Sequence, residues 1–270
     1  MLAFRDRLAA AIQAKRSAVC VGLDPRFAQL PPRFAQSLPP AWALLEFNKY
    51  VIDQVADVCP IVKPQSAFYE LYGADGIASL VETIRYAKSK GLLVLLDVKR
   101  GDMGATSEAY AEAYLSADGP FDVDALTING YQGTDCLQPF LDQAREHAKG
   151  VFVLVKTSNP SSVEIQDLRT ETGEPVFEAM AKLVDRWDCE AVVGATYPRE
   201  AARARELMPR ATILAPGYGA QGATAQDVVP SFRADGSGAI VNNSRGIIFA
   251  ADARQAAIDM RDAINAALGA

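Results

Sequence analysis

The 270-residue sequence contains only one histidine, His147. Zinc sites built on several imidazoles and the Ser-His-Asp triad of hydrolases both depend on histidine, so a single copy argues against either. His147 lies near the end of a predicted helix and is soon followed by Lys149 and Gly150. That position is typical of a solvated residue at a helix C-terminus, so we assign it no chemistry.

Cysteine and long apolar runs are also scarce. The four cysteines form no Cys-x-x-Cys pair and are expected to be buried free thiols in a reducing compartment: Cys20, Cys59, Cys136 and Cys189. No apolar run reaches 18 residues, and the first twenty residues alternate charged and apolar side chains at helical spacing. We therefore expect no membrane span and no signal peptide, and a cytoplasmic location.

An excess of positive charge is absent too. The chain has 27 Lys and Arg against 33 Asp and Glu, which gives a formal net charge of −6. We expect no general surface for a nucleic-acid polymer or an anionic membrane, so any phosphate group must be held by a local cluster. Half of the residues are hydrophobic and 22% are charged, as in a globular protein that buries a full core.

Eight short apolar segments alternate with segments whose apolar residues recur every three or four positions. The candidate strands are 18–23, 60–63, 92–98, 123–128, 151–155, 191–194, 211–215 and 239–241. The clearest helical patterns cover 77–90, 107–115, 178–187 and 253–268. This alternation implies parallel strands, and eight such units predict a closed (β/α)8 TIM barrel that forms one domain over residues 1–270.

In such a barrel the loops that follow the strands build the active site. The three longest predicted loops, 25–45, 157–175 and 216–224, all follow strands, and loops of this length are commonly lids or binding segments. The predicted strand ends are also polar, with these side chains at or just after them: Asp24, Lys63, Thr157, Ser158 and Arg245. Any one of them could cap a helix or lie on the surface, but together they indicate a common opening.

The third predicted strand is the first part of the segment LLVLLDVKRGDMGATS. This segment is apolar until Asp97 and then supplies Lys99 and Asp102. Side chains two positions apart on a strand point the same way, so Asp97 and Lys99 should share a face at the barrel mouth. A lysine beside carboxylates there can deliver a proton to a carbon atom above it. The competing interpretation, an exposed ion-pair ladder, is less favoured because the pattern follows an apolar strand.

The segment GYGAQG at 217–222 matches the G-x-G-x-x-G pattern of dinucleotide-binding proteins. That pattern normally opens the first strand-helix unit and precedes an acidic residue, whereas here it follows the seventh strand and the next strand end reads VNNS. The barrel interpretation fits better. N–H groups of this turn and of Ser244, Arg245 and Gly246 would form a phosphate nest, to which the Arg245 guanidinium adds a bidentate contact.

Taken in order, these motifs resemble the orotidine 5'-monophosphate decarboxylase family, in particular its longer bacterial branch. The shared segments are VGLDPR, IVKPQSAF, LLDVKRGDMGATSEAYA, VKTSNPSS, APGYGAQG and NNSRGI, of which DVKRGDMGAT is the most specific. The resemblance implies an enzyme that needs no cofactor and no metal and converts orotidine 5'-monophosphate (OMP) to uridine 5'-monophosphate (UMP). It also implies a homodimer with shared active sites.

The resemblance further implies roles for individual residues. Lys99 would donate the proton to C6 within an alternating charged array: Lys63, Asp97, Lys99 and Asp102. Asp102 and Thr106 would reach into the partner's site. The substrate contacts would be Asp24 and Lys63 at the ribose, Ser158 at the pyrimidine, and Gln221 and Arg245 at the phosphate.

Two departures from the family and two alternatives remain. MGAT at 103–106 replaces the Ile-Pro-Asn-Thr of many members, and the 25–45 segment is longer than in compact members. One alternative is a Mg²⁺-dependent sugar-phosphate lyase on the same barrel, but such enzymes place a glutamate where this chain has Lys63, whose ammonium would repel the cation. The other is a non-catalytic barrel that binds nucleotide phosphates and leaves Lys99 idle.

Overall fold

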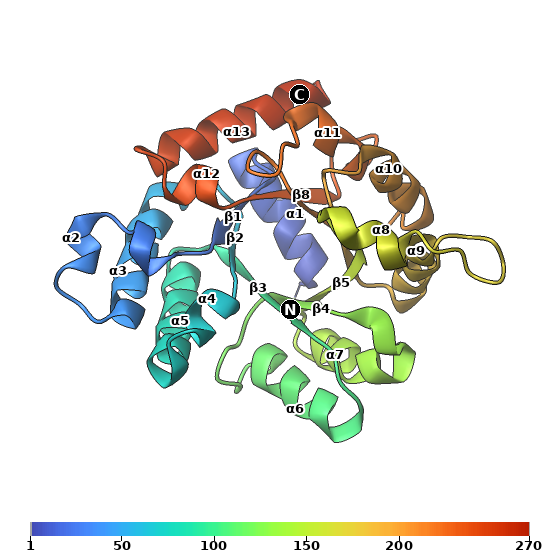
Figure 1. The fold of residues 1–270 in the computed structure, drawn as a ribbon, viewed down its shortest axis with the longest axis horizontal. Coiled ribbons are helices and arrows are strands. Elements are labelled where there is room, and N and C mark those ends of the chain that lie inside the picture. The colour runs from blue at the N-terminus through green and yellow to red at the C-terminus, as the bar shows by residue number, and fades with distance from the viewer. Residues whose placement is uncertain (1, 270) are drawn as a thin grey trace.

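Eight parallel strands form a closed barrel in the order of the chain, in a computed structural model that describes residues 2–269 (Figure 1). This arrangement confirms the predicted (β/α)8 fold. The strands are β1 (Val19–Leu23), β2 (Ile61–Pro64), β3 (Leu93–Arg100), β4 (Ala125–Ile128), β5 (Gly150–Lys156), β6 (Glu190–Val193), β7 (Ile213–Pro216) and β8 (Ala239–Asn243). All eight predicted strands are present, with ends that differ by a few residues.

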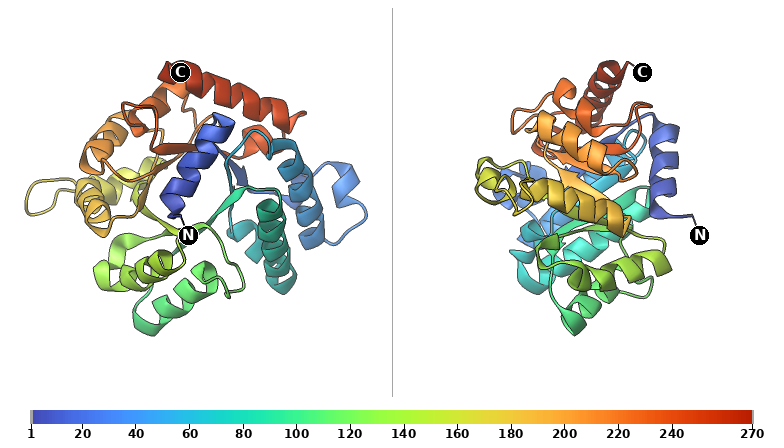
Figure 2. Two further views of the ribbon diagram at one scale, coloured as in Figure 1. Left: turned by 180° about the vertical axis from the view of Figure 1, so that it is seen from behind. Right: turned by 90° about the vertical axis from the view of Figure 1, so that its right-hand side faces the viewer.

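The inside of the barrel is filled by one layer of apolar side chains, to which every strand contributes. Its members are Cys20, Ile61, Leu95, Ala125, Phe152, Val192, Leu214 and Ile240. Helix α1 (Phe4–Lys15) lies across the N-terminal end of the barrel, where the strands begin, and adds Phe4 and Leu8 to this layer (Figure 2). The Phe4 and Phe152 rings meet edge to face at 5.9 Å. The barrel is therefore a packed core that is closed at its N-terminal end.

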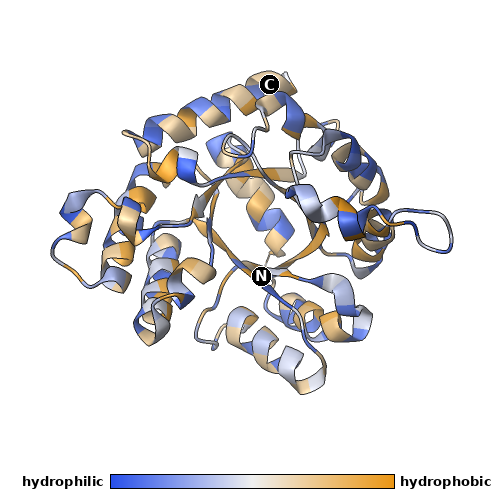
Figure 3. Ribbon diagram, in the orientation of Figure 1, coloured by the Kyte–Doolittle hydropathy of each residue, from blue (hydrophilic) through white to orange (hydrophobic). Residues whose placement is uncertain are grey.

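An outer ring of helices covers the strands. The longer ones are α3 (Pro40–Val55), α5 (Gly73–Ser89), α6 (Gly104–Leu115), α7 (Thr134–Glu146), α9 (Val176–Trp187), α10 (Pro198–Leu207) and α13 (Ala253–Leu268). In α9, Phe177, Ala181 and Val184 recur at spacings of four and three residues and are buried, as an amphipathic helix on a barrel requires. Figure 3 shows the hydrophobic strands inside a ring of helices of mixed hydropathy.

The prediction of a loop over residues 25–45 is wrong in part. This segment contains a 3-10 turn (Phe27–Gln29) and the short helix α2 (Pro32–Ala35), and α3 already begins at Pro40. Proline is tolerated in the first turn of a helix because that N–H has no partner within the helix. Two of the prolines that suggested a loop, Pro32 and Pro40, are therefore the first residues of helices.

Other features agree with expectation. All four cysteines are free and buried, and burial raises the pKa of the inward-facing Cys20 thiol to about 12. His147 follows the last residue of α7. Across residues 2–269, none of the helices has the length and apolar character needed to span a bilayer.

Candidate active site

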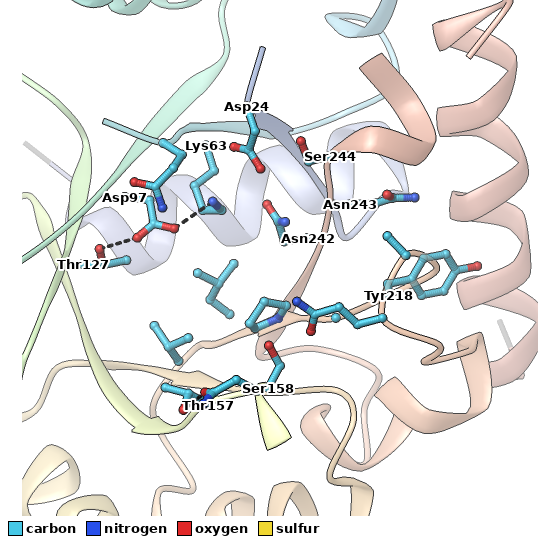
Figure 4. Close-up of a pocket in the computed structure, with 18 of the residues that line it drawn as sticks. Asp24, Lys63, Asp97, Thr127, Thr157, Ser158, Tyr218, Asn242, Asn243 and Ser244 are labelled. Carbon is cyan, nitrogen blue, oxygen red and sulfur yellow. Dashed lines mark hydrogen bonds and ion pairs between the residues drawn. The ribbon is translucent and has the colours of Figure 1, made fainter. Parts of the chain in front are cut away.

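A cavity of about 530 Å³ opens at the C-terminal end of the barrel, among the strand ends (Figure 4). The sequence predicted that the polar strand ends would meet at one opening, and they do. The predicted residues that line the cavity are Asp24, Lys63, Asp97, Lys99, Thr157, Ser158, Gln221 and Arg245. Gly246, Asp102 and Thr106 are not among the residues that line the cavity of their own chain.

Two lysines contact opposite oxygens of one carboxylate. Lys63 Nζ lies 2.9 Å from Asp97 Oδ2, and Lys99 Nζ lies 2.5 Å from Asp97 Oδ1. The second contact joins the side chains of Asp97 and Lys99 at the barrel mouth, as predicted. The Lys63 side chain is only 5% exposed, whereas that of Lys99 is 44% exposed. Both lysines line the cavity, and Lys99 is the more exposed of the two.

These contacts set the charges of the array. Burial alone would raise the pKa of Asp97, but the ammonium groups of Lys63 and Lys99 outweigh it and hold that pKa well below its usual range. Burial alone would lower the pKa of Lys63, yet the carboxylates of Asp97 and Asp24 raise it above its usual value. Asp97 thus stays anionic and Lys63 cationic at neutral pH.

The backbone is irregular at Lys99. Its φ is +46°, in the left-handed region that is unfavourable for a residue with a Cβ. The pairing of β3 with β4 shifts register between Leu96 and Arg100. Within this bulge the Val98 and Lys99 N–H groups both donate to Thr127 Oγ1, at 3.0 Å each. Strand alternation does not predict such a bulge, and a threonine within an apolar strand carries no distinguishing signal.

The ends of β1 and β8 supply polar atoms without protein partners. At these two strand ends, four buried side-chain oxygens have no hydrogen-bond partner among the described residues: Asp24 Oδ1, Asn242 Oδ1, Asn243 Oδ1 and Ser244 Oγ. Figure 4 shows Asp24, Asn242 and Ser244 around one part of the cavity. Because buried polar groups nearly always have partners, these atoms indicate a polar ligand. Asp24 was singled out from the sequence. Asn242 and Asn243 were not, although they are part of the VNNS segment that argued against a dinucleotide site.

The glycine-rich turn after β7 forms the wall next to the end of β8. Gly217, Gly219 and Gly222 have φ values of +114°, +68° and +93°, which favour residues without a Cβ. This conformation brings Tyr218 and Gln221 to the cavity, near Arg245 at the start of α12 (Arg245–Ile248). The arrangement offers a guanidinium and an amide on one side, which suits an anionic group.

The segment after β5 is held down by two side chains that the sequence did not single out. Gln166 Oε1 accepts from the Thr157 N–H at 2.9 Å, and Gln166 Nε2 donates to Thr157 Oγ1 at 2.8 Å. Lys156, which is fully buried, forms an ion pair with Asp167 at 2.6 Å. These contacts tie the short helix α8 (Val163–Gln166) and its flank to the strand, and so hold Thr157 and Ser158 at the cavity.

Asp102 and Thr106 follow β3 on the outer side of the mouth. Asp102 Oδ1 accepts from the Met103 N–H at 2.8 Å, and Thr106 is exposed in the first turn of α6. The Met103 side chain is also exposed, at 64%. A single chain therefore brings together Lys63, Asp97 and Lys99 but leaves Asp102 apart from them.

A metal site has no evident donors here. Within residues 2–269, no three His, Cys, Asp or Glu side chains converge as metal ligands do. Both oxygens of Asp97 already accept from ammonium groups, so a divalent cation bound there would have to displace Lys63 or Lys99.

Fold and cavity together define a class of protein, a (β/α)8-barrel enzyme with a lysine-aspartate array, a glycine-rich turn and an arginine at its C-terminal mouth. Residues 17–260 match the model of the orotidine 5'-phosphate decarboxylase / HUMPS family. The chain belongs to this family.

Individual relatives agree with the family match. The orotidine 5'-phosphate decarboxylase of Rhodopirellula baltica is 44% identical over 271 residues, which cover 93% of this chain and 89% of the relative. That of Halorubrum lacusprofundi is 45% identical over 260 residues, with the same coverage. The solved structure of Leishmania donovani OMP decarboxylase superposes with a TM-score of 0.86 at 37% identity and covers 100% of both chains.

Proposed function

We propose that this chain decarboxylates OMP to UMP and CO2 in pyrimidine biosynthesis, with Lys99 as the proton donor. The family match and the named relatives support this reaction, whereas they give no support to a Mg²⁺-dependent lyase or a non-catalytic barrel. The observation that carries the assignment of residues is the array of Lys63, Asp97 and Lys99 at the cavity, in which the Lys99 side chain is the more exposed of the two lysines.

Substrate binding follows from the polar walls of the cavity. Asp24 and Lys63 hold the ribose hydroxyls, and Asp24 Oδ1 is one of the buried oxygens that lack a protein partner. Ser158 contacts the pyrimidine. Gln221 and Arg245 bind the phosphate, together with backbone N–H groups of the glycine-rich turn and of Gly246. Contacts to the phosphate, which does not react, fix the position of the pyrimidine over the array.

The chemistry takes place at the carbon that carries the carboxylate. The substrate carboxylate lies beside Asp97, and when the bond from C6 to the carboxylate carbon breaks, CO2 leaves and the electron pair stays on C6. The Lys99 ammonium stabilises this developing negative charge and donates a proton to C6, which gives UMP. The resulting neutral lysine regains its proton from water. Lys63 keeps Asp97 anionic and in place throughout.

The proposal extends to the assembly. Two copies of a single-domain chain, residues 1–270, form a homodimer in which Asp102 and Thr106 complete the partner's site. In support, exposed apolar side chains lie in the segments that follow three neighbouring strands, β2, β3 and β4: Leu71, Met103 and Tyr131. We also propose a cytoplasmic location, which four free, buried thiols support.

The direct test is turnover of OMP by the purified chain in the presence of EDTA. The proposal predicts loss of the substrate's absorbance and formation of UMP, unchanged by the chelator. A metal-dependent lyase would require added Mg²⁺ for its reaction. A non-catalytic barrel would bind UMP but leave OMP intact.

A further inference from the structure

Thr127, on β4, lies at the centre of the charged array without a role in the mechanism described so far. Its side chain lines the cavity beside Asp97, although the residue is only 1% exposed (Figure 4). The neighbouring strand residues Leu126 and Ile128 are apolar and pack in the outer core. A hydroxyl at this point is therefore the polar exception on its strand.

The hydroxyl of Thr127 makes three hydrogen bonds, the number that it can support. It donates to Asp97 Oδ1 at 2.8 Å and accepts from the N–H groups of Val98 and Lys99 at 3.0 Å each. The direction of each bond is fixed because an ionised carboxylate can only accept and a backbone N–H can only donate. One donor and two acceptor positions are thereby all occupied.

These bonds close a ring around Lys99. The Lys99 N–H donates to Thr127 Oγ1, which donates to Asp97 Oδ1, and the same oxygen accepts from Lys99 Nζ at 2.5 Å. The main chain and the side-chain end of Lys99 are thus linked through one hydroxyl and one carboxylate oxygen. A shift of the hydroxyl would move both ends.

The ring also acts on a strained backbone. The left-handed conformation of Lys99 is unfavourable for a residue with a Cβ and persists only where the surroundings hold it. At the bulge, the N–H groups of Val98 and Lys99 bond to the Thr127 hydroxyl, and without it they would be left without these partners. The hydroxyl thus accepts the hydrogen bonds that backbone carbonyls would accept from these two N–H groups in a regular pairing of β3 with β4.

We infer that Thr127 is a positioning residue, which sets the direction of the Lys99 ammonium by holding both the bulge and the Asp97 carboxylate. This inference rests on the proposed role of Lys99 as proton donor. Thr127 itself acts only through Lys99 and Asp97. Its effect should therefore fall on the chemical step and leave nucleotide affinity nearly unchanged.

Three variants test this role. Thr127→Val keeps the shape and removes the hydroxyl, Thr127→Ser keeps the hydroxyl, and Thr212→Val makes the same change at a buried threonine at the opposite end of the barrel. Misplacing a catalytic group by about 1 Å can cost on the order of 10²-fold in rate. We expect Thr127→Val to lower kcat by roughly 10- to 100-fold with a nearly unchanged Kd for UMP. Thr127→Ser and Thr212→Val should stay close to wild type in kcat.

Several results would overturn the inference. A wild-type kcat in Thr127→Val, or an equal loss of kcat in Thr127→Ser, would show that the hydroxyl does not position Lys99. A loss of UMP affinity as large as the loss of kcat would assign Thr127 to binding or to the fold. If Thr127→Val fails to fold, Thr127→Ala provides the same comparison with Thr127→Ser. If the wild-type protein leaves OMP unchanged, the proposed function itself fails.

Discussion

Arg245 brings a permanent positive charge to the cavity from the first turn of α12. In a chain of net charge −6, a bound phosphate depends on such local groups. Removing the guanidinium takes away a charge-assisted contact of about 1.5–3 kcal/mol, or roughly 10- to 150-fold in affinity. We expect Arg245→Ala to weaken UMP binding by this factor and to leave the weak binding of uridine nearly unchanged, as measured by calorimetry.

Arg254→Ala is the matched control, because Arg254 forms a surface ion pair with Asp57 outside the cavity. It should bind both ligands as the wild type does. Equal weakening of UMP and uridine in Arg245→Ala would mean that Arg245 acts on the fold or on the base, and the phosphate assignment would have to be withdrawn.

Asp97 makes stability depend on pH in a defined direction. Its pKa in the folded protein lies well below the unfolded value of about 3.9. An acid of this kind stabilises the fold fully above its unfolded pKa, and this contribution is lost as the pH falls through the folded value. The difference in unfolding free energy between wild type and Asp97→Asn should therefore be largest near neutral pH and shrink below about pH 4.

Urea unfolding of both proteins at neutral pH and at pH values below 4 measures this difference. In the variant, Lys63 lacks the Asp97 carboxylate at every pH in this range. The resulting loss of stability is therefore the same at each pH and does not affect how the difference in unfolding free energy changes with pH. A difference that stays constant down to about pH 3 would show that the two lysines do not hold the pKa of Asp97 down.

At the residue scale, the sequence predicted what strand alternation can express. Asp97 and Lys99 were placed together because residues two apart on a strand share a face. Thr127 could not be found in this way, since its role depends on a bulge in the neighbouring strand and threonine is common in strands. Asn242 and Asn243 became informative only when their oxygens were found buried without partners.

At the scale of elements, the segment after β5 depends on the buried Lys156. Its ammonium pairs with Asp167 and lies 4.6 Å from the ring centre of Tyr197. Asp167→Ala would leave this buried charge without its counter-ion. Such a loss typically costs 3–5 kcal/mol, and we expect about 1–3 kcal/mol here because the Asp167 side chain is 38% exposed. Because the segment carries Thr157 and Ser158, KM for OMP should rise as well.

Thermal unfolding and steady-state kinetics measure both effects. Adding Lys156→Met to Asp167→Ala removes the unpaired charge and should restore much of the stability. The control is Lys182→Ala, which breaks an exposed pair with Glu174 in the same region and should have little effect. An Asp167→Ala protein as stable as wild type would show that the pair does not hold the segment.

The elements themselves were predicted well because their apolar periodicity is strong. All eight strands and the helix over 253–268 were found where expected. The error over residues 25–45 arose because prolines are common both in loops and in the first turn of a helix. The sequence alone does not distinguish these two uses, whereas the structure places Pro40 at the start of α3.

At the scale of the whole molecule, the proposed dimer makes a prediction that a monomer cannot meet. In a mixed dimer of Lys99→Ala and Asp102→Ala subunits, one site carries both defects and the other carries neither. Random mixing should therefore restore about a quarter of the wild-type sites, while each variant alone stays inactive. Activity measured before and after subunit exchange, with dimers detected by sedimentation, provides the test. Mixed dimers without recovered activity would show that the sites are not shared.

The central claim, that Lys99 delivers the proton in decarboxylation, is tested most directly by the kcat of Lys99→Ala with OMP. A positioned proton donor contributes typically 10²- to 10⁴-fold, so we predict a loss of at least this size. The variant should remain folded and bind UMP, because Lys99 is half-exposed at the barrel mouth and does not pack in the core. A folded Lys99→Ala protein that loses less than about tenfold in kcat would contradict the account.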